Sequence, residues 1–358
     1  MMATNPRPPS HLASRPLASS EQPRTSAAAV PSLRATPADF QAGFSLLVYA
    51  PEPQADSQYA ALLDRLVGLN VNSVAIVFPV YTDGVTSDTV RSGPDTPSAD
   101  SLAALTRLAR ARGFTVMWRP ILDESSLLPA WRGEIRPRDT TAWFRSYGSL
   151  ILGYARLAAQ DQVDSLAIGT ELNSMEQYVA SWQGLLQQVR QVYRGQVTYA
   201  YNYNTFFQTG LWSDLDFISV DAYFPLDHTP AGASVAQMSA DWQRWLAELQ
   251  RFDGSYHKPI VFTEVGVVPK AGAHLRPWDS SVSGAFDLGE QRAYYEATCD
   301  ATPNVVQGLY WWAAGTSLPA RLQPSDFDPL SRPAEDVVRS CYGVIEGKPS
   351  PTVGLVAR

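Results

Sequence analysis

The chain has 358 residues, of which 45% are hydrophobic and 18% are charged, and its net charge is −7 at pH 7. This length suffices for one large α/β barrel or two ordinary domains. The negative charge argues against a nucleic acid or an anionic membrane as a partner. No run approaches the roughly 18 apolar residues of a membrane span, and the N-terminus lacks an apolar signal core. Two localisations stay open: a cytoplasmic protein, or a secreted one whose start or signal lies outside this sequence.

Three segments differ in composition. Residues 1–38 contain no Phe, Trp or Tyr and are rich in Pro, Ala, Ser and Arg. Such a segment cannot bury enough surface to offset the entropy of ordering, so we predict a disordered leader there. A single catalytic domain is predicted over residues 39–346, and residues 347–358 form a C-terminal tail.

Eight short apolar runs follow one another along the predicted domain. Each is typical of a strand buried on both faces, and amphipathic helical patterns such as 143–158 and 178–192 separate them. The predicted strands are residues 44–49, 73–78, 115–119, 165–170, 197–201, 217–221, 260–263 and 306–312. Eight strands alternating with helices predict an α/β fold, the (β/α)8 or TIM barrel. A doubly wound open sheet is the alternative, but no Gly-x-Gly-x-x-Gly or Walker-type loop follows any strand.

Two of the predicted strands lead into a glutamate. Glu171 follows the fourth strand and Glu264 follows the seventh. A carboxylate at the end of an apolar run costs free energy to hold there unless something uses it. In an eight-stranded barrel, these strands lie on opposite sides of the mouth where active sites form. Two carboxylates facing each other across a sugar are typical of glycosidases. The alternative is that each glutamate pairs with an arginine at a helix N-terminus.

Seven segments, taken together, resemble one family of such enzymes. They are residues 96–102 (TPSADSL), 131–137 (WRGEIRP), 143–147 (WFRSY), 168–172 (IGTEL), 221–225 (DAYFP), 258–264 (KPIVFTE) and 311–312 (WW). They resemble glycoside hydrolase family 113, whose characterised members are β-mannanases with (β/α)8 barrels of the retaining clan. The resemblance implies that Glu171 is the general acid/base, that Glu264 is the nucleophile, and that Tyr223 hydrogen-bonds the nucleophile. It implies cleavage of β-1,4-mannan or mannooligosaccharides without a cofactor.

Two departures from the family pattern put the sugar in question. Thr170 stands where the clan usually has the Asn that contacts the sugar 2-hydroxyl. Asn202 is a candidate replacement, and Asn202 and Asn204 can each offer a donor and an acceptor. Residues 118–123 read WRPILD, where the family more often has Lys-Pro-His before the Asp. The same fold and mechanism acting on another β-linked glycan is therefore an alternative, as is a non-catalytic sugar-binding barrel. The other glycans considered are a glucan, a galactan and a bacterial surface polysaccharide.

Further side chains at the predicted mouth are candidates for sugar binding. Arg119 and Asp123, near the end of the third strand, are expected to bind sugar hydroxyls or else to form a structural ion pair. Trp278, in the loop after the seventh strand, is expected to be a platform for a neighbouring sugar or a packing residue. Trp311 and Trp312 end the eighth strand, and alternation lets only one of them face the lumen. We favour Trp311 as the floor under the reacting sugar.

The histidines and cysteines indicate no metal centre. The four histidines show no HExxH or other ligand spacing, so no metal is predicted. Whether Cys299 and Cys341 pair stays open, because sequence does not fix their separation. The predicted partner is an oligo- or polysaccharide, and we take the chain to be a monomer.

Overall fold

The computed structural model describes residues 40–49, 55–208, 210–230, 232–315, 326–345 and 347. Every described residue belongs to one compact unit, which lies within Arg34–Arg358. The predicted leader (1–38) and all of the predicted tail except its first residue lie outside these ranges. Within them, no helix has the length and apolar character needed to cross a membrane.

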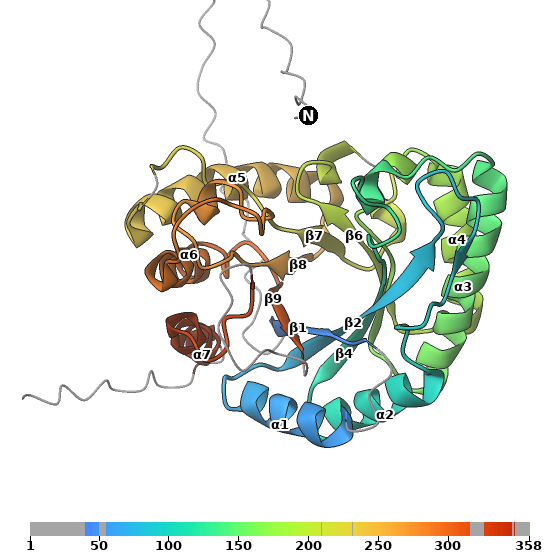
Figure 1. The fold of residues 1–358 in the computed structure, drawn as a ribbon, viewed down its shortest axis with the longest axis horizontal. Coiled ribbons are helices and arrows are strands. Elements are labelled where there is room, and N and C mark those ends of the chain that lie inside the picture. Colours follow the sequence, from blue (N-terminus) through green and yellow to red (C-terminus); the bar gives the residue numbers. More distant parts are fainter. Residues whose placement is uncertain are drawn as a thin grey trace, which may run out of the picture. The chain divides into compact units, whose positions relative to one another are not determined.

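A closed barrel of eight parallel strands forms the centre of the described chain, and Figure 1 shows helices around it. Strand order follows chain order, and the first strand pairs with both the second and the last, which closes the barrel. The predicted (β/α)8 barrel is therefore confirmed. Its strands are β1 (Gln41–Leu47), β2 (Ser73–Thr82), β4 (Thr115–Leu122), β5 (Ser165–Thr170), β6 (Gln196–Asn202), β7 (Ile218–Asp221), β8 (Ile260–Val265) and β9 (Gly308–Gly315). The short β3 (Val90–Arg91) pairs antiparallel with the end of β2.

The described residues contain seven α-helices, of which six lie between barrel strands and α7 follows β9. Several begin at a side chain that accepts a backbone N–H: Ser98 caps α2, Asp139 caps α3 and Asp287 caps α6. The helices are α1 (Ala55–Val67), α2 (Ala99–Arg110), α3 (Thr140–Gln160), α4 (Val179–Val192), α5 (Val235–Tyr256), α6 (Leu288–Ala301) and α7 (Pro333–Ile345). The described part of the β6–β7 connection contains two short 3-10 helices instead.

Side-chain alternation along the strands produces two apolar layers. In β2, Val74, Ile76 and Phe78 belong to the large cluster between strands and helices. Ala75 and Val77 belong to a small separate cluster that fills the lumen. The other members of this lumen cluster are Met117, Ile121, Phe217, Val261 and Tyr310. The lumen is thus packed with side chains, so a substrate has access only to the mouth.

A disulfide joins the last two helices of the described residues. Cys299 of α6 and Cys341 of α7 are bonded, with 5.8 Å between their Cα atoms. The question of whether these cysteines pair is answered by this bond, which ties α7 to α6.

Candidate active site

Both glutamates singled out by the sequence lie at the C-terminal ends of barrel strands. Glu171 directly follows β5, the fourth barrel strand, and Glu264 lies near the end of β8, the seventh. Only 7% of Glu171 and 4% of Glu264 is exposed. Burial raises the pKa of Glu171 to about 7; the charge of Arg132 opposes this rise and the charge of Glu264 adds to it. Near neutral pH, Glu171 can therefore hold or release a proton.

Two donors hold the carboxylate of Glu264. The hydroxyl of Tyr223 donates to Oε2 at 2.8 Å, so the bond predicted between these residues is present. Arg119 Nη2 donates to Oε1 at 2.7 Å. Bonds from an N–H or O–H to a carboxylate favour its charged form and fix its direction. The side chain of Glu264 is thereby aimed, and the guanidinium of Arg119 balances its charge from within the protein.

The structure corrects the role expected of Arg119. This residue has no exposed surface, so it does not reach a sugar hydroxyl. Nor does it pair with Asp123: its guanidinium binds Asp221 at 3.2 Å, Glu264, and the carbonyl oxygen of Thr263 at 2.9 Å. The side chain points into the barrel beside the nucleophile candidate, because β4 alternates inward at residues 117, 119 and 121. Arg119 therefore positions Glu264.

Glu171 is held by a second, different pair of donors. Asn202, the last residue of β6, donates from Nδ2 to Oε1 at 2.8 Å. Arg132 donates from Nη1 to Oε2 at 2.9 Å. The sequence considerations did not single out Arg132, although residues 131–137 carried the family resemblance. Its position in the short 3-10 helix Arg132–Glu134 has no strand or helix periodicity that would indicate a site.

The backbone at Glu171 adopts an uncommon conformation. Its φ of 50° lies in the left-handed region, which is unusual for a residue with a side chain and is typical of functional sites. Neighbouring contacts support it. A Cβ on Gly169 would lie 2.5 Å from the ring of Tyr199, so only glycine lets that ring approach. The Tyr199 hydroxyl then accepts the N–H of Leu172 at 3.0 Å. Gly169 thus helps to hold the chain on both sides of Glu171.

The remaining polar candidates lie around the mouth. Asp123 directly follows β4 and is half-buried, and its Oδ1 accepts the N–H of Ser125 at 2.8 Å. Asn202 uses both ends of its amide, since its Oδ1 also accepts the N–H of Asn204 at 3.2 Å. Asn204 accepts a long bond of 3.4 Å from Asn173. Asp123 and Asn204 therefore keep unused hydrogen-bonding capacity for a ligand.

Trp278 forms an aromatic pair at the rim. Its ring stacks on Tyr203 with centroids 5.2 Å apart and 22° between the planes. Trp278 is 43% exposed, which is unusual for so large an apolar side chain. Burial raises the pKa of Tyr203 to about 12, and the negative charge of Glu171 adds to this effect. Tyr203 directly follows Asn202, which binds Glu171, so the pair lies on the Glu171 side of the mouth and offers an open aromatic face.

The choice between the two tryptophans of β9 was wrong. Trp311 has no exposed surface and stacks on Tyr295 of α6, with ring centroids 3.9 Å apart. It thus lies on the helix side of the barrel wall. Trp312 is partly exposed and packs against the lumen cluster. Because neighbouring residues of a strand point to opposite faces, Trp312 is the residue that faces the mouth.

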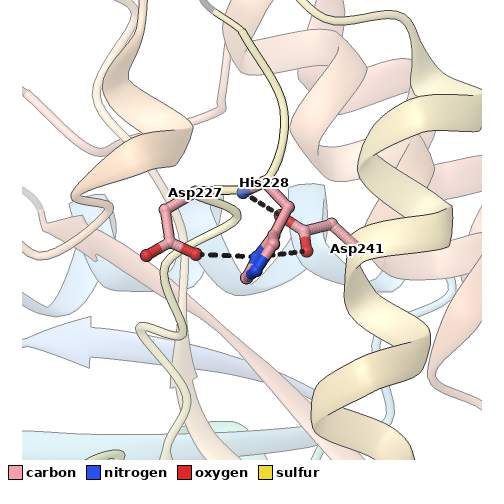
Figure 2. A group of neighbouring side chains, drawn as sticks. All are labelled: Asp227, His228 and Asp241. Carbon is pink, nitrogen blue, oxygen red and sulfur yellow. Dashed lines mark hydrogen bonds and ion pairs between the residues drawn. The ribbon is translucent and has the colours of Figure 1, made fainter.

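One group of side chains has the composition of a metal site, and Figure 2 shows it: Asp227, His228 and Asp241. His228 Nδ1 lies 3.2 Å from Asp227 Oδ1 and 3.4 Å from Asp241 Oδ1. Arg244 already supplies a cation there, 2.9 Å from Asp227 and 3.3 Å from Asp241. We therefore interpret the group as an ion-pair cluster that anchors the start of the β7–α5 connection to α5.

Comparison with known proteins identifies relatives of this barrel. The sequence model of the family named Glycoside Hydrolase Family 113 matches residues 52–326 of this chain. The family 113 β-mannanase of Alicyclobacillus acidocaldarius is similar in structure, with 27% identity and a TM-score of 0.75, over 86% of this chain and 98% of that one. A second family 113 β-1,4-mannanase has 25% identity and a TM-score of 0.76, over 85% of this chain and 99% of that one.

More distant matches share only the fold. One of these matches comes from a structural study of two fungal β-1,4-galactanases. It has 14% identity and a TM-score of 0.52, over 85% of this chain and 99% of that one. No curated protein sequence matches the chain. Because the family match covers most of the sequence, the chain belongs to glycoside hydrolase family 113 and is a glycoside hydrolase.

Proposed function

We propose that this enzyme cleaves β-1,4-mannan or mannooligosaccharides with retention of anomeric configuration. Glu264 is the nucleophile and Glu171 is the acid/base. The observation that carries this proposal is that two buried glutamates at one barrel mouth have different surroundings. Glu264 accepts hydrogen bonds from two donors that fix its direction, one of them the positively charged Arg119, whereas burial raises the pKa of Glu171 to about 7. Such a contrast assigns one carboxylate to attack and the other to proton transfer.

The proposed reaction proceeds in two steps. In the first, Glu264 attacks the anomeric carbon, the bond to the leaving oxygen breaks, and Glu171 gives its proton to that oxygen. The product is a glycosyl ester on Glu264. In the second, Glu171 takes a proton from water while the water oxygen attacks the anomeric carbon and releases Glu264. Tyr223 and Arg119 hold Glu264 on line in both steps, as their bonds of 2.8 and 2.7 Å support.

Substrate binding uses the side chains that line the mouth. Trp312 replaces Trp311 as the floor under the reacting sugar, because it faces the lumen side. The stacked pair of Tyr203 and Trp278 offers a flat apolar face to a neighbouring sugar ring. Asp123 can accept a sugar hydroxyl. The choice of mannan rests on the two family 113 β-mannanases that resemble this chain.

Azide rescue of two alanine variants tests the roles of both glutamates with one substrate class, an aryl β-mannobioside. Glu264→Ala should be inactive, and azide should restore turnover as the α-glycosyl azide, with inverted configuration. Glu171→Ala should form the β-glycosyl azide, because azide then attacks the glycosyl-enzyme. Wild-type activity in Glu264→Ala, or the same azide anomer from both variants, would contradict the proposal.

A second candidate is the same mechanism on another β-linked glycan. It is favoured by Ile121, which lies in the lumen cluster where family members more often have a histidine. Arg119 no longer supports it, since that residue is buried behind Glu264. Release of reducing ends from a panel of mannan, glucomannan, β-glucan and galactan decides between the two. Activity on mannan and glucomannan alone removes this candidate.

A further inference from the structure

Both oxygens of the Glu171 carboxylate accept bonds from nitrogen donors. Asn202 Nδ2 lies 2.8 Å from Oε1 and Arg132 Nη1 lies 2.9 Å from Oε2. A proton on either oxygen weakens the bond that this oxygen accepts, and the bond to Arg132 loses most because it pairs two charges. The observed geometry therefore suits ionised Glu171, the form needed for the second step. It opposes the protonated form that the first step needs.

Arg132 has another carboxylate within reach. Its Nη2 lies 3.1 Å from Glu124 Oε1, and its Nε donates to the carbonyl oxygen of Leu122 at 2.9 Å. A shift of the guanidinium toward Glu124 breaks the bond to Glu171 while two of the three interactions persist. The positive charge stays paired, so no buried charge is left without a partner. The side chain of Glu124 is 35% exposed against 10% for Glu171, so water also stabilises the pair that results.

We propose that Arg132 is a positioning residue that alternates between Glu171 and Glu124. Its move to Glu124 lets Glu171 carry the proton that the leaving sugar oxygen requires, and its return stabilises the ionised Glu171 that activates water. The inference rests on the acid/base role proposed for Glu171. The guanidinium of Arg132 then has two positions, one at Glu171 and one at Glu124. The charge of Glu171 and the bound sugar both shift the equilibrium between these positions.

The direction of the effect follows from the charges around Glu171. The other titratable groups that act on it or respond to its charge are Glu264, Arg119, Glu176, Tyr203, Asp221 and Tyr223. All of them are unchanged by substitutions at positions 124 and 132. Removing the positive charge of Arg132 raises the pKa of Glu171. Removing the charge of Glu124 leaves Glu171 as the remaining carboxylate bound by Arg132 and lowers the pKa of Glu171.

The test is the pH dependence of kcat/KM on a mannooligosaccharide for Arg132→Gln and Glu124→Gln. Since kcat/KM falls as pH rises through the pKa of the acid, this alkaline limb reports Glu171. We expect the limb to move to higher pH in Arg132→Gln and to lower pH in Glu124→Gln. Each shift should be about one pH unit, because a charge within ~4–6 Å moves a carboxyl pKa by about 1–3 units. Arg132→Lys keeps the charge without the fork of donors and should give a limb between wild type and Arg132→Gln.

Glu134→Gln is the matched control. Like Glu124→Gln, it removes one negative charge, and Glu134 lies in the same 3-10 helix as Arg132. The carboxylate of Glu134, however, is exposed and accepts the N–H of Trp131. Its limb should coincide with that of wild type. A dinitrophenyl β-mannobioside, whose leaving group needs no proton, should be cleaved by all variants with little change in the first step.

Two outcomes overturn the inference in distinguishable ways. If Glu171→Ala loses the alkaline limb while the Glu124→Gln and Arg132→Gln limbs stay in place or move the same way, the alternation is refuted and the acid/base assignment stands. If Glu171→Ala keeps the limb, the acid/base assignment itself is wrong and the inference falls with it.

Discussion

Replacing Tyr223 by phenylalanine removes one of the two bonds that hold the proposed nucleophile. The hydroxyl lies 2.8 Å from Glu264 Oε2, while the ring packs edge-on to Phe327 and should keep its place. A hydrogen bond to a charged group contributes about 1.5–3 kcal/mol. Each 1.36 kcal/mol corresponds to a tenfold change in rate, so we expect kcat/KM to fall roughly 10- to 100-fold. The loss should be partial, because Arg119 still binds the other oxygen at 2.7 Å.

The assay is steady-state kinetics on mannotetraose with a matched tyrosine variant. Tyr193→Phe also removes a buried hydroxyl, one that donates to the carbonyl oxygen of Val163 at 2.8 Å. It precedes β6 at the opposite end of the barrel from the mouth, so it should lower the free energy of unfolding and leave kcat/KM unchanged. The reasoning is refuted if Tyr223→Phe stays within twofold of wild type, or if Tyr193→Phe loses as much activity.

Three further predictions concern stability and pH. Cys299→Ser should lower the free energy of unfolding by about 4 kcal/mol, the loop entropy for a separation of 42 residues, and reductant should then have no effect on urea unfolding. Arg119→Met leaves buried Asp221 and Glu264 without a counter-charge and should cost about 3–5 kcal/mol in the same assay; a loss below 1 kcal/mol contradicts the buried pairing. Because the pKa of Glu171 is raised to about 7, kcat/KM should fall tenfold per pH unit above that value, and a plateau up to pH 9 contradicts this.

The barrel itself could be predicted because its eight strands and their order follow from local apolar pattern. The strand ends could not. Predicted strands ended at residues 78 and 119, yet β2 runs to residue 82 and β4 to residue 122. Pro79 and Pro120 follow the predicted ends, and proline lacks the N–H that a ladder uses. In the structure they occupy adjacent register positions, and both strands continue past them toward the mouth.

The site could be predicted only where it coincides with a strand end. Glu171, Glu264 and Tyr223 follow apolar runs, and that pattern is visible in the sequence. Arg132 is not visible in this way, because the carboxylate it binds is distant in sequence and its 3-10 helix has no period. The prediction that Trp311 and not Trp312 faces the lumen failed for another reason. Both faces of a barrel strand are apolar, so composition does not indicate which face points to the lumen.

The two arginines of the site differ in a way that matches the two proposed roles. Arg119 has no exposed surface and is bound by Asp221, Glu264 and a backbone carbonyl, so no event at the mouth can free it. A nucleophile needs this permanence, since it must be ionised whenever a sugar arrives. The side chain of Arg132 is 17% exposed and bridges two carboxylates. An acid/base changes its charge twice in each turnover, so a fixed counter-charge would hinder one of its two steps. Substitution at Arg119 should therefore act on stability and nucleophile geometry, and substitution at Arg132 on the pH dependence of the reaction.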